Sequence, residues 1–147
     1  MPDKGGPVPL RKSLGTDMAS LDTNCLLRWF LDDIPEQCQR VEALLLAKMP
    51  LVVDDAAIIE SIFALEVGGR LSRQLIRGFI DTAAAQPITM DRALWAEILD
   101  VWVGHPKLSV VDVYLATKAK ANGNEPLYTF DAKLINQMDC TAAVPSS

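Results

Sequence analysis

Short apolar runs recur along the chain, and each is followed by polar residues and then by a longer segment with helical periodicity. Continuous apolar runs of this length are typical of strands that are buried on both faces of a parallel sheet. Strands that alternate with helices place those helices on the two faces of one sheet. The pattern therefore predicts the α/β class, as a three-layer α/β/α sandwich with a central parallel sheet. The predicted strands are Met18–Leu21, Leu51–Val53, Pro87–Thr89 and Leu127–Phe130.

Between these strands, apolar side chains recur every three or four residues, which is the spacing that buries one face of a helix. Caps and breakers set the helix ends: Ser72 and Asp91 are good N-caps, and Pro50 ends a helix. Ser109 and Asp112 have the spacing of a capping box. The predicted helices are 24–31, 35–48, 56–67, one from Ser72 to Ala85, one that follows Asp91, one from Ser109 to Ala121, and 132–138.

The chain divides into one domain and two tails. Residues 1–17 contain three prolines, three glycines and little apolar periodicity, which is typical of a flexible tail. We expect the domain over residues 18–140 and a C-terminal tail over residues 141–147. With 147 residues, of which 50% are hydrophobic and 22% charged, the chain can bury a substantial core.

Neither a membrane segment nor a secretion signal is apparent in the sequence. No apolar run approaches the roughly 20 residues that cross a bilayer, and the N-terminus lacks the apolar core of a signal peptide. The three cysteines have no C-x-x-C spacing, so neither a disulfide framework nor a zinc site is indicated. These features predict a cytoplasmic protein with reduced cysteines and no membrane partner.

Four acids stand out by their positions in the predicted strands and helices. Asp22 and Asp131 each follow a predicted strand directly. Glu60 interrupts an apolar helix, where an unpaired charge is costly, and Asp112 lies in the first turn of a later helix. Because the carboxyl ends of parallel strands lie at one edge of a sheet, we expect the four acids to be close together. The simpler alternatives are helix caps for the three aspartates and a solvent-exposed helix edge for the glutamate.

A group of four carboxylates needs a partner for its charge. Clustered carboxylates repel one another unless some are protonated or a hard divalent cation holds them together. Oxygen ligands without neighbouring Cys or clustered His favour Mg²⁺ or Mn²⁺ over zinc, and such a cation activates water for attack on a phosphodiester. The net charge of −5 argues against a nucleic-acid partner, but cations bound by the acids would offset it.

The segments that carry the four acids resemble the PIN domain, the nuclease module of VapC-type toxins in bacterial and archaeal toxin–antitoxin pairs. The resemblance covers residues Met18–Met138, and the order and spacing of the acids, with D-x-N first and T-x-D last, are specific as a set. The matching segments are Leu21–Asn24, Ile58–Leu65, Val111–Ala119 and Leu127–Asp131.

The resemblance implies endoribonucleolytic cleavage of RNA at a site that binds Mg²⁺ or Mn²⁺. Asn24 and Thr129 match positions that support the acids by hydrogen bonds. Leu115 stands where some relatives have a further acid, so one metal ion is a firmer expectation than two. A toxin of this type would bind a small antitoxin protein, and PIN-like toxins tend to form homodimers. The implied catalytic and metal-binding residues are Asp22, Glu60, Asp112 and Asp131.

Basic residues follow three of the acid segments and are candidates for contacts with RNA phosphates. Positive charge beside a metal site favours binding of the RNA backbone. The candidates are Arg28, Lys118 and Lys133.

Other functions fit parts of the pattern. A PIN-like module that binds RNA or protein without cleavage would keep the fold and lack productive metal binding. A phosphotransfer enzyme that forms an aspartyl-phosphate would need a D-x-D signature where this chain has Asn24. Nucleophilic catalysis by Ser or Cys would depend on His105, the only histidine, which lies in a Gly-Pro loop. We therefore expect a Mg²⁺- or Mn²⁺-dependent ribonuclease.

Overall fold

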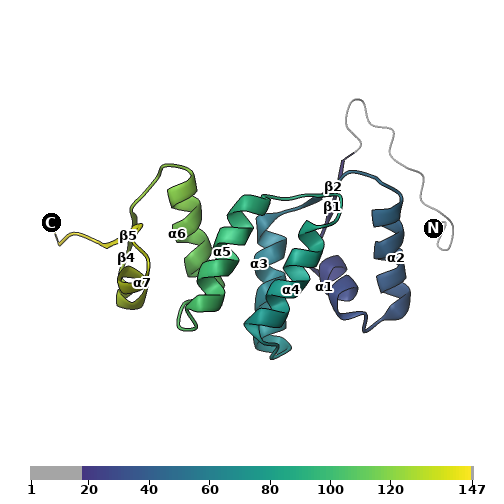
Figure 1. Ribbon diagram of the computed structural model, residues 1–147, viewed down its shortest axis with the longest axis horizontal. Coiled ribbons are helices and arrows are strands. Elements are labelled where there is room, and N and C mark those ends of the chain that lie inside the picture. Colours follow the sequence, from purple (N-terminus) through teal and green to yellow (C-terminus); the bar gives the residue numbers. More distant parts are fainter. Residues whose placement is uncertain (1–17, 147) are drawn as a thin grey trace.

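The computed structural model describes residues 18–146, which form seven α-helices, one π-helical turn and five short strands (Figure 1). The predicted N-terminal tail, residues 1–17, lies outside the described residues. Strands and helices alternate in the predicted order. The elements are β1 (Ala19–Leu21), α1 (Thr23–Leu31), α2 (Pro35–Leu46), β2 (Leu51–Val53), α3 (Asp55–Phe63), the π-helix η1 (Ala64–Gly68), α4 (Arg73–Ala84), β3 (Ile88–Thr89), α5 (Arg92–Gly104), α6 (Val110–Ala121), β4 (Leu127–Thr129), α7 (Ala132–Gln137) and β5 (Thr141–Ala143).

The strands form two sheets, and every strand pair is parallel. The first sheet has the order β1-β2-β3, and the second consists of β4 and β5. Figure 1 shows β1 and β2 toward one end of the long axis and β4 and β5 toward the other, with α3, α5 and α6 between them. The parallel pairing matches the prediction, whereas its division between two sheets differs from the single central sheet that the alternation predicts.

The second sheet extends the folded chain beyond the predicted domain boundary at residue 140. β5 lies within residues 141–147, for which we expected a tail, and pairs with β4 from Leu127 opposite Thr141 to Thr129 opposite Ala143. The sequence Thr-Ala-Ala has neither apolar alternation nor bulky side chains, so it carries no local strand signal. Pairing with β4 determines its conformation.

The hydrophobic core lies mainly between the first sheet and the helices that follow its strands. Ile62 and Trp102 are fully buried, and Trp95 is 1% exposed, as expected for core residues. The two faces of the first sheet differ, because Leu21 and Val53 are buried in register whereas Ser20 and Thr89 are exposed. One face of this sheet is therefore packed, and the other is largely uncovered by the residues that the structure describes.

Two of the broader expectations concern membranes and cysteines. In the described part of the chain, no helix is long and apolar enough to cross a membrane. Cys38 and Cys140 are buried free thiols, and Cys25 is half-buried. Burial raises the pKa of the Cys38 and Cys140 thiols, which disfavours the reactive thiolate.

Candidate active site

Asp22 lies at the carboxyl end of β1 and is the N-cap of α1. Its backbone is extended, and its Oδ1 accepts a hydrogen bond of 2.9 Å from the Cys25 backbone N–H. This hydrogen bond favours the charged carboxylate and holds the pKa of Asp22 below the ordinary value of 3.8. The residue is exposed. At neutral pH, Asp22 therefore presents an ionised carboxylate at the end of the sheet.

Glu60 lies on α3, on the side that faces the start of α1. The Thr23 hydroxyl donates a hydrogen bond of 2.6 Å to Glu60 Oε1, which joins positions 37 residues apart. Glu60 is exposed, so its place in an apolar segment does not bury the charge. The structure thus brings the Asp22 segment and the Glu60 segment together, as the sequence analysis expects.

Asp112 lies in the first turn of α6. The Ser109 hydroxyl accepts a hydrogen bond of 3.1 Å from the Asp112 backbone N–H, which confirms the predicted cap of this helix. The Asp112 residue is half-buried. The cap uses only the backbone N–H of Asp112, so it leaves the carboxylate available for another role.

Asp131 follows β4 and is the N-cap of α7. Its Oδ1 accepts a hydrogen bond of 2.9 Å from the Lys133 backbone N–H. The Thr129 hydroxyl accepts a bond of 3.0 Å from the Asp131 backbone N–H. This contact orients the start of α7, and the role of Thr129 in support of the acid stays a prediction. Asp131 therefore repeats at β4 what Asp22 does at β1.

The four acids are divided between the two sheets. Asp22 and Glu60 belong to the part built on the first sheet, whereas Asp131 ends β4 in the second sheet (Figure 1). Among the described residues, no group of three or more His, Cys, Asp or Glu side chains is placed to hold a metal ion. As one chain places them, the four carboxylates do not fit the Mg²⁺ or Mn²⁺ site that the resemblance implies.

Lys118, a predicted RNA contact, forms an ion pair with an acid of its own chain. Its Nζ lies 3.0 Å from Asp55 Oδ2, and this hydrogen bond raises the pKa of Lys118. Asp55 also accepts hydrogen bonds from Trp95 Nε1 (2.9 Å) and the Tyr114 hydroxyl (2.8 Å). Burial by itself would raise the pKa of Asp55, but the three donors together hold it below 3.8. This network fastens α6 to the start of α3 and to α5.

Arg28, a second predicted RNA contact, lies beside Asp22. Its Nε lies 3.2 Å from Asp33 Oδ1, so the two side chains form an ion pair, but the N–H of Nε forms no hydrogen bond among the described atoms. Arg28 and Asp22 line a groove of about 310 Å³ between α1 and α2, together with Asn24 and Arg40. Arg40 is well exposed, and its ion pair with Glu36 is a solvent-exposed one. The groove brings two guanidinium groups close to the first acid.

Lys133, the third predicted RNA contact, lies in the first turn of α7. It is exposed, and no carboxylate of the described chain forms an ion pair with it. Asn24 is exposed as well and lines the groove that contains Asp22. The roles of these two residues remain predictions.

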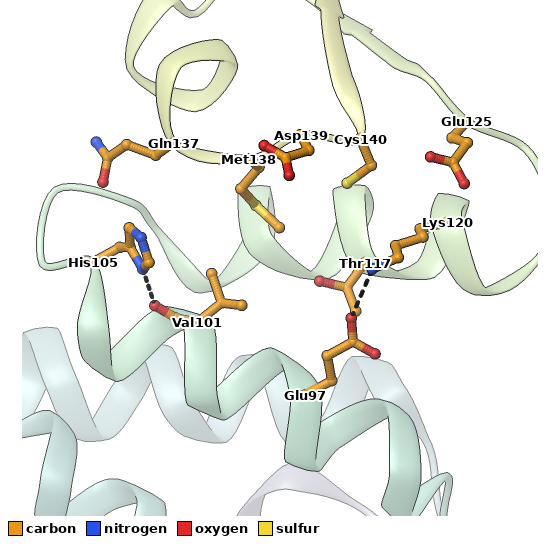
Figure 2. Close-up of a pocket in the computed structure, with 10 residues that line it drawn as sticks. All are labelled: Glu97, Val101, His105, Thr117, Lys120, Glu125, Gln137, Met138, Asp139 and Cys140. Atoms are coloured by element: carbon orange, nitrogen blue, oxygen red, sulfur yellow. Dashed lines mark hydrogen bonds and ion pairs between the residues drawn. The ribbon is translucent and has the colours of Figure 1, made fainter.

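A cavity of about 220 Å³ lies between α5, α6 and the segment that joins α7 to β5 (Figure 2). None of the four acids lines it. His105 is half-buried there and places Nδ1 2.7 Å from the Val101 carbonyl oxygen. The Thr117 hydroxyl, which is buried, has no hydrogen-bond partner among the described atoms. This cavity is a feature of the packing between the two parts of the molecule and is separate from the acids.

Thr23 is a residue of this site that was not predicted from the sequence. The hydroxyl in Asp-Thr-Asn was a usable signal, because a short polar side chain beside a carboxylate is suited to orient a second one. Asp54 and Asp91, which follow β2 and β3, cap the next helices as Asp22 does, and the cap at Asp91 was predicted from the sequence. The carboxyl ends of four strands therefore carry a capping aspartate.

In a comparison with protein families, the model of the PIN domain family matches residues 19–139, and this range includes all four acids. The match and the alternation of helices with parallel strands confirm the predicted fold class. Neither a curated protein nor a solved structure matches the chain.

Proposed function

Because the chain belongs to the PIN domain family, we propose that it is a metal-dependent endoribonuclease that hydrolyses phosphodiester bonds of RNA. The PIN domain is generally a nuclease fold, and its nucleases generally use divalent metal ions. The observation that carries the proposal is the exposed, ionised Asp22 beside the Thr23–Glu60 hydrogen bond at the end of β1. Oxygen ligands of this kind favour Mg²⁺ or Mn²⁺ as the ion.

The groove between α1 and α2 supports RNA as the substrate. Arg28 and Arg40 line it together with Asp22, so a phosphate backbone that lies in the groove would pass directly by the first acid. Guanidinium groups bind phosphates through paired hydrogen bonds, and such contacts position a nucleic acid without reading its sequence. Each of these arginines forms an ion pair with an acid of its own chain, Asp33 or Glu36, so an RNA phosphate would compete with those acids for the guanidinium groups.

The test is the Asp22→Asn variant, assayed for Mn²⁺-dependent cleavage of a mixed-sequence RNA. Asn is as good an N-cap as Asp, so the variant should fold like the wild type while it loses a carboxylate ligand. We expect activity to fall by more than about 100-fold. The matched control is Asp54→Asn, an exposed capping aspartate at the end of β2. Full activity of Asp22→Asn would rule out the proposed role of the acids.

A second candidate function is a PIN-like module that binds RNA or protein without cleaving it. The division of the acids between the two sheets favours this candidate, because it leaves no group of ligands for a metal ion in the described chain. Thermal unfolding in the presence of Mg²⁺ or Mn²⁺ separates the two functions. A nuclease that binds the ion in its folded state gains stability as the ion concentration rises, whereas the binding module does not.

We also propose that the protein is the toxin of a toxin–antitoxin pair, because the acid-bearing segments resemble VapC-type toxins. Apolar side chains on α2 and at the end of α3 offer surface for a small antitoxin, since Leu46 is 80% and Phe63 60% exposed. Induced expression of the protein should arrest growth, and co-expression of the product of a short adjacent gene should relieve the arrest. Growth that continues at the wild-type rate would contradict the toxin role.

A further inference from the structure

In the described part of the chain, β1 and β4 each have one edge without a strand partner. β1 pairs only with β2, and β4 pairs only with β5. Ala19 N–H donates to Pro50 O, and Leu127 N–H donates to Cys140 O. Because backbone groups of successive residues alternate between the two edges of a strand, Ser20 and Tyr128 direct theirs to the unpaired edges. Each of these edges can accept another parallel strand.

The outer edge of β3 is different, because a charged side chain occupies it. The Arg92 guanidinium donates hydrogen bonds of 2.7 Å to Ile88 O in β3 and of 2.9 Å to Gln86 O just before it. A charged side chain at an edge strand is one of the means by which proteins prevent further pairing. No such group covers β1 or β4 among the described residues, so these two edges are the better candidates for a new contact.

The side chains around these edges are also suited to burial. Phe130 is 88% and Tyr128 56% exposed, although aromatic residues are usually covered. The uncovered face of the first sheet carries Ser20, Val52 and Thr89 in register, and parallel sheets almost always have both faces covered. Both parts therefore expose apolar or sheet surface that the described chain does not cover.

We propose that two copies of the protein exchange this contact, so that β4 of each copy pairs in parallel with β1 of the other. The pairing would extend each first sheet to five strands, in the order β3-β2-β1 followed by β4 and β5 of the second copy. Figure 1 shows β1 and β4 toward opposite ends of an elongated molecule. Two such molecules, related by a twofold axis, can form both contacts at once and leave a closed dimer.

A second copy fits these edges better than the chain's own β4, because the second sheet is held on α6. Cys140 and Leu134 are buried there, and Cys140 Sγ lies 3.5 Å from Ala116 O. The Asp55 network in turn holds α6 against α3 and α5. Exchange between copies preserves all of these contacts.

The exchange would also complete the divided site, and this part of the inference rests on the proposed function. Neighbouring strands of a sheet lie about 4.8 Å apart. Parallel pairing of β1 with β4 of a second copy would therefore bring Asp22 next to Asp131 of that copy. Each site would then combine Asp22 and Glu60 from one chain with Asp131 from the other.

The first test measures strand pairing without reference to activity. Full-length Ser20→Cys protein is unfolded and refolded together with Tyr128→Cys protein and treated with a short thiol-reactive cross-linker. We expect a covalent dimer of twice 16.1 kDa. The control replaces Ser20→Cys with Gln74→Cys, an exposed position on α4, and should give only the background of the native cysteines. The Ser20→Cys/Tyr128→Cys double variant shows whether the two positions can be cross-linked within one chain. Cross-linking only within one chain, or no cross-linking at all, would overturn the proposal.

The second test asks whether the copies share a site. Asp22→Asn and Asp131→Asn both keep a good N-cap, so both should fold, and each should be inactive alone. In a mixture refolded together, about half of the dimers combine the two variants, and one site of each such dimer is intact, so about a quarter of the wild-type activity should return. If the wild type is active and the refolded mixture of the two variants is not, the shared site is overturned. If the cysteine variants cross-link between copies but the wild type cleaves no RNA, the proposed function is refuted and the exchange of strands is still supported.

Discussion

The part of the molecule built on the first sheet and the part built on the second sheet differ in how completely each is covered. The first part contains Ile62, Ile98 and Trp102, which are fully buried. In the second part, which comprises β4, α7 and β5, Leu134 is the most buried side chain at 2% exposure, and Phe130 is 88% exposed. The first part therefore holds its own core, whereas the second depends on its neighbours for cover.

The contact between the two parts is correspondingly less tight than the core of the first. The cavity of about 220 Å³ lies there, and the unpartnered Thr117 hydroxyl lines it (Figure 2). Native interiors contain few unpaired buried polar groups, so the Thr117 hydroxyl is the sign of a less complete contact. The comparison indicates that capping aspartates alone do not define the site, because both parts have them.

The largest expected effect comes from substitutions that destabilise the core of each part separately. Ile62→Ala should destabilise the protein by about 2–5 kcal/mol, because it empties a fully buried position on α3. Leu134→Ala should act mainly on the second part. Amide hydrogen exchange measures the difference: Ile62→Ala should lower protection throughout the chain, and Leu134→Ala only in β4, α7 and β5. Equal loss of protection everywhere in both variants would show that the two parts unfold as one.

The next effect concerns the link between α6 and the first part. Asp55→Ala removes the acceptor of three donors and leaves Trp95 Nε1 without a partner in the core, which should cost about 2–3 kcal/mol. Lys118 contributes little of this, because its side chain is 40% exposed and solvent screens the pair. Urea unfolding measures the change, with Asp54→Asn as the control.

This second prediction has a definite dependence on pH. The folded-state pKa of Asp55 lies below the ordinary value of 3.8, so its carboxylate stabilises the fold above that value. The stability is lost as the pH falls through the folded-state pKa. The difference between the wild type and Asp55→Ala should thus be constant from about pH 7 to about pH 5 and shrink in stronger acid. A difference that does not change with acid would assign the cost to packing.

Features that depend on neighbouring residues could be predicted from the sequence, whereas contacts between residues far apart in the chain could not. The apolar runs and the cap at Ser109 predicted strands and α6, because periodicity and capping depend on neighbouring residues. The Thr23–Glu60 bond joins residues 37 apart, and the Lys118–Asp55 bond joins residues 63 apart. No local pattern specifies such pairs. For the same reason, the runs of apolar residues could not predict which strand edges pair, and the small residues of β5 gave no signal at all.

A smaller effect tests how the edge of the first sheet is protected. Arg92→Met removes hydrogen bonds to Ala84 O, Gln86 O and Ile88 O, which should cost about 1–2 kcal/mol. It also uncovers the outer edge of β3, so light scattering should show more association than in the wild type. Arg40→Met, which removes only an exposed ion pair, should stay within about 0.5 kcal/mol of the wild type. Unchanged stability and scattering in Arg92→Met would show that this edge needs no cap.

The smallest expected effect has the opposite sign and concerns the contact between the two parts. Thr117→Val replaces a buried hydroxyl that has no partner among the described atoms with a methyl group of similar size. Relief of that unpaired group should stabilise the protein by about 1 kcal/mol. The matched control is Thr141→Val in β5, where the buried hydroxyl donates a bond of 2.7 Å to Met138 O and its loss should cost about 1 kcal/mol. Thermal unfolding compares the two, and a destabilised Thr117→Val would mean that the hydroxyl has a partner in the cavity, so that the contact between the two parts is as complete as the core of the first.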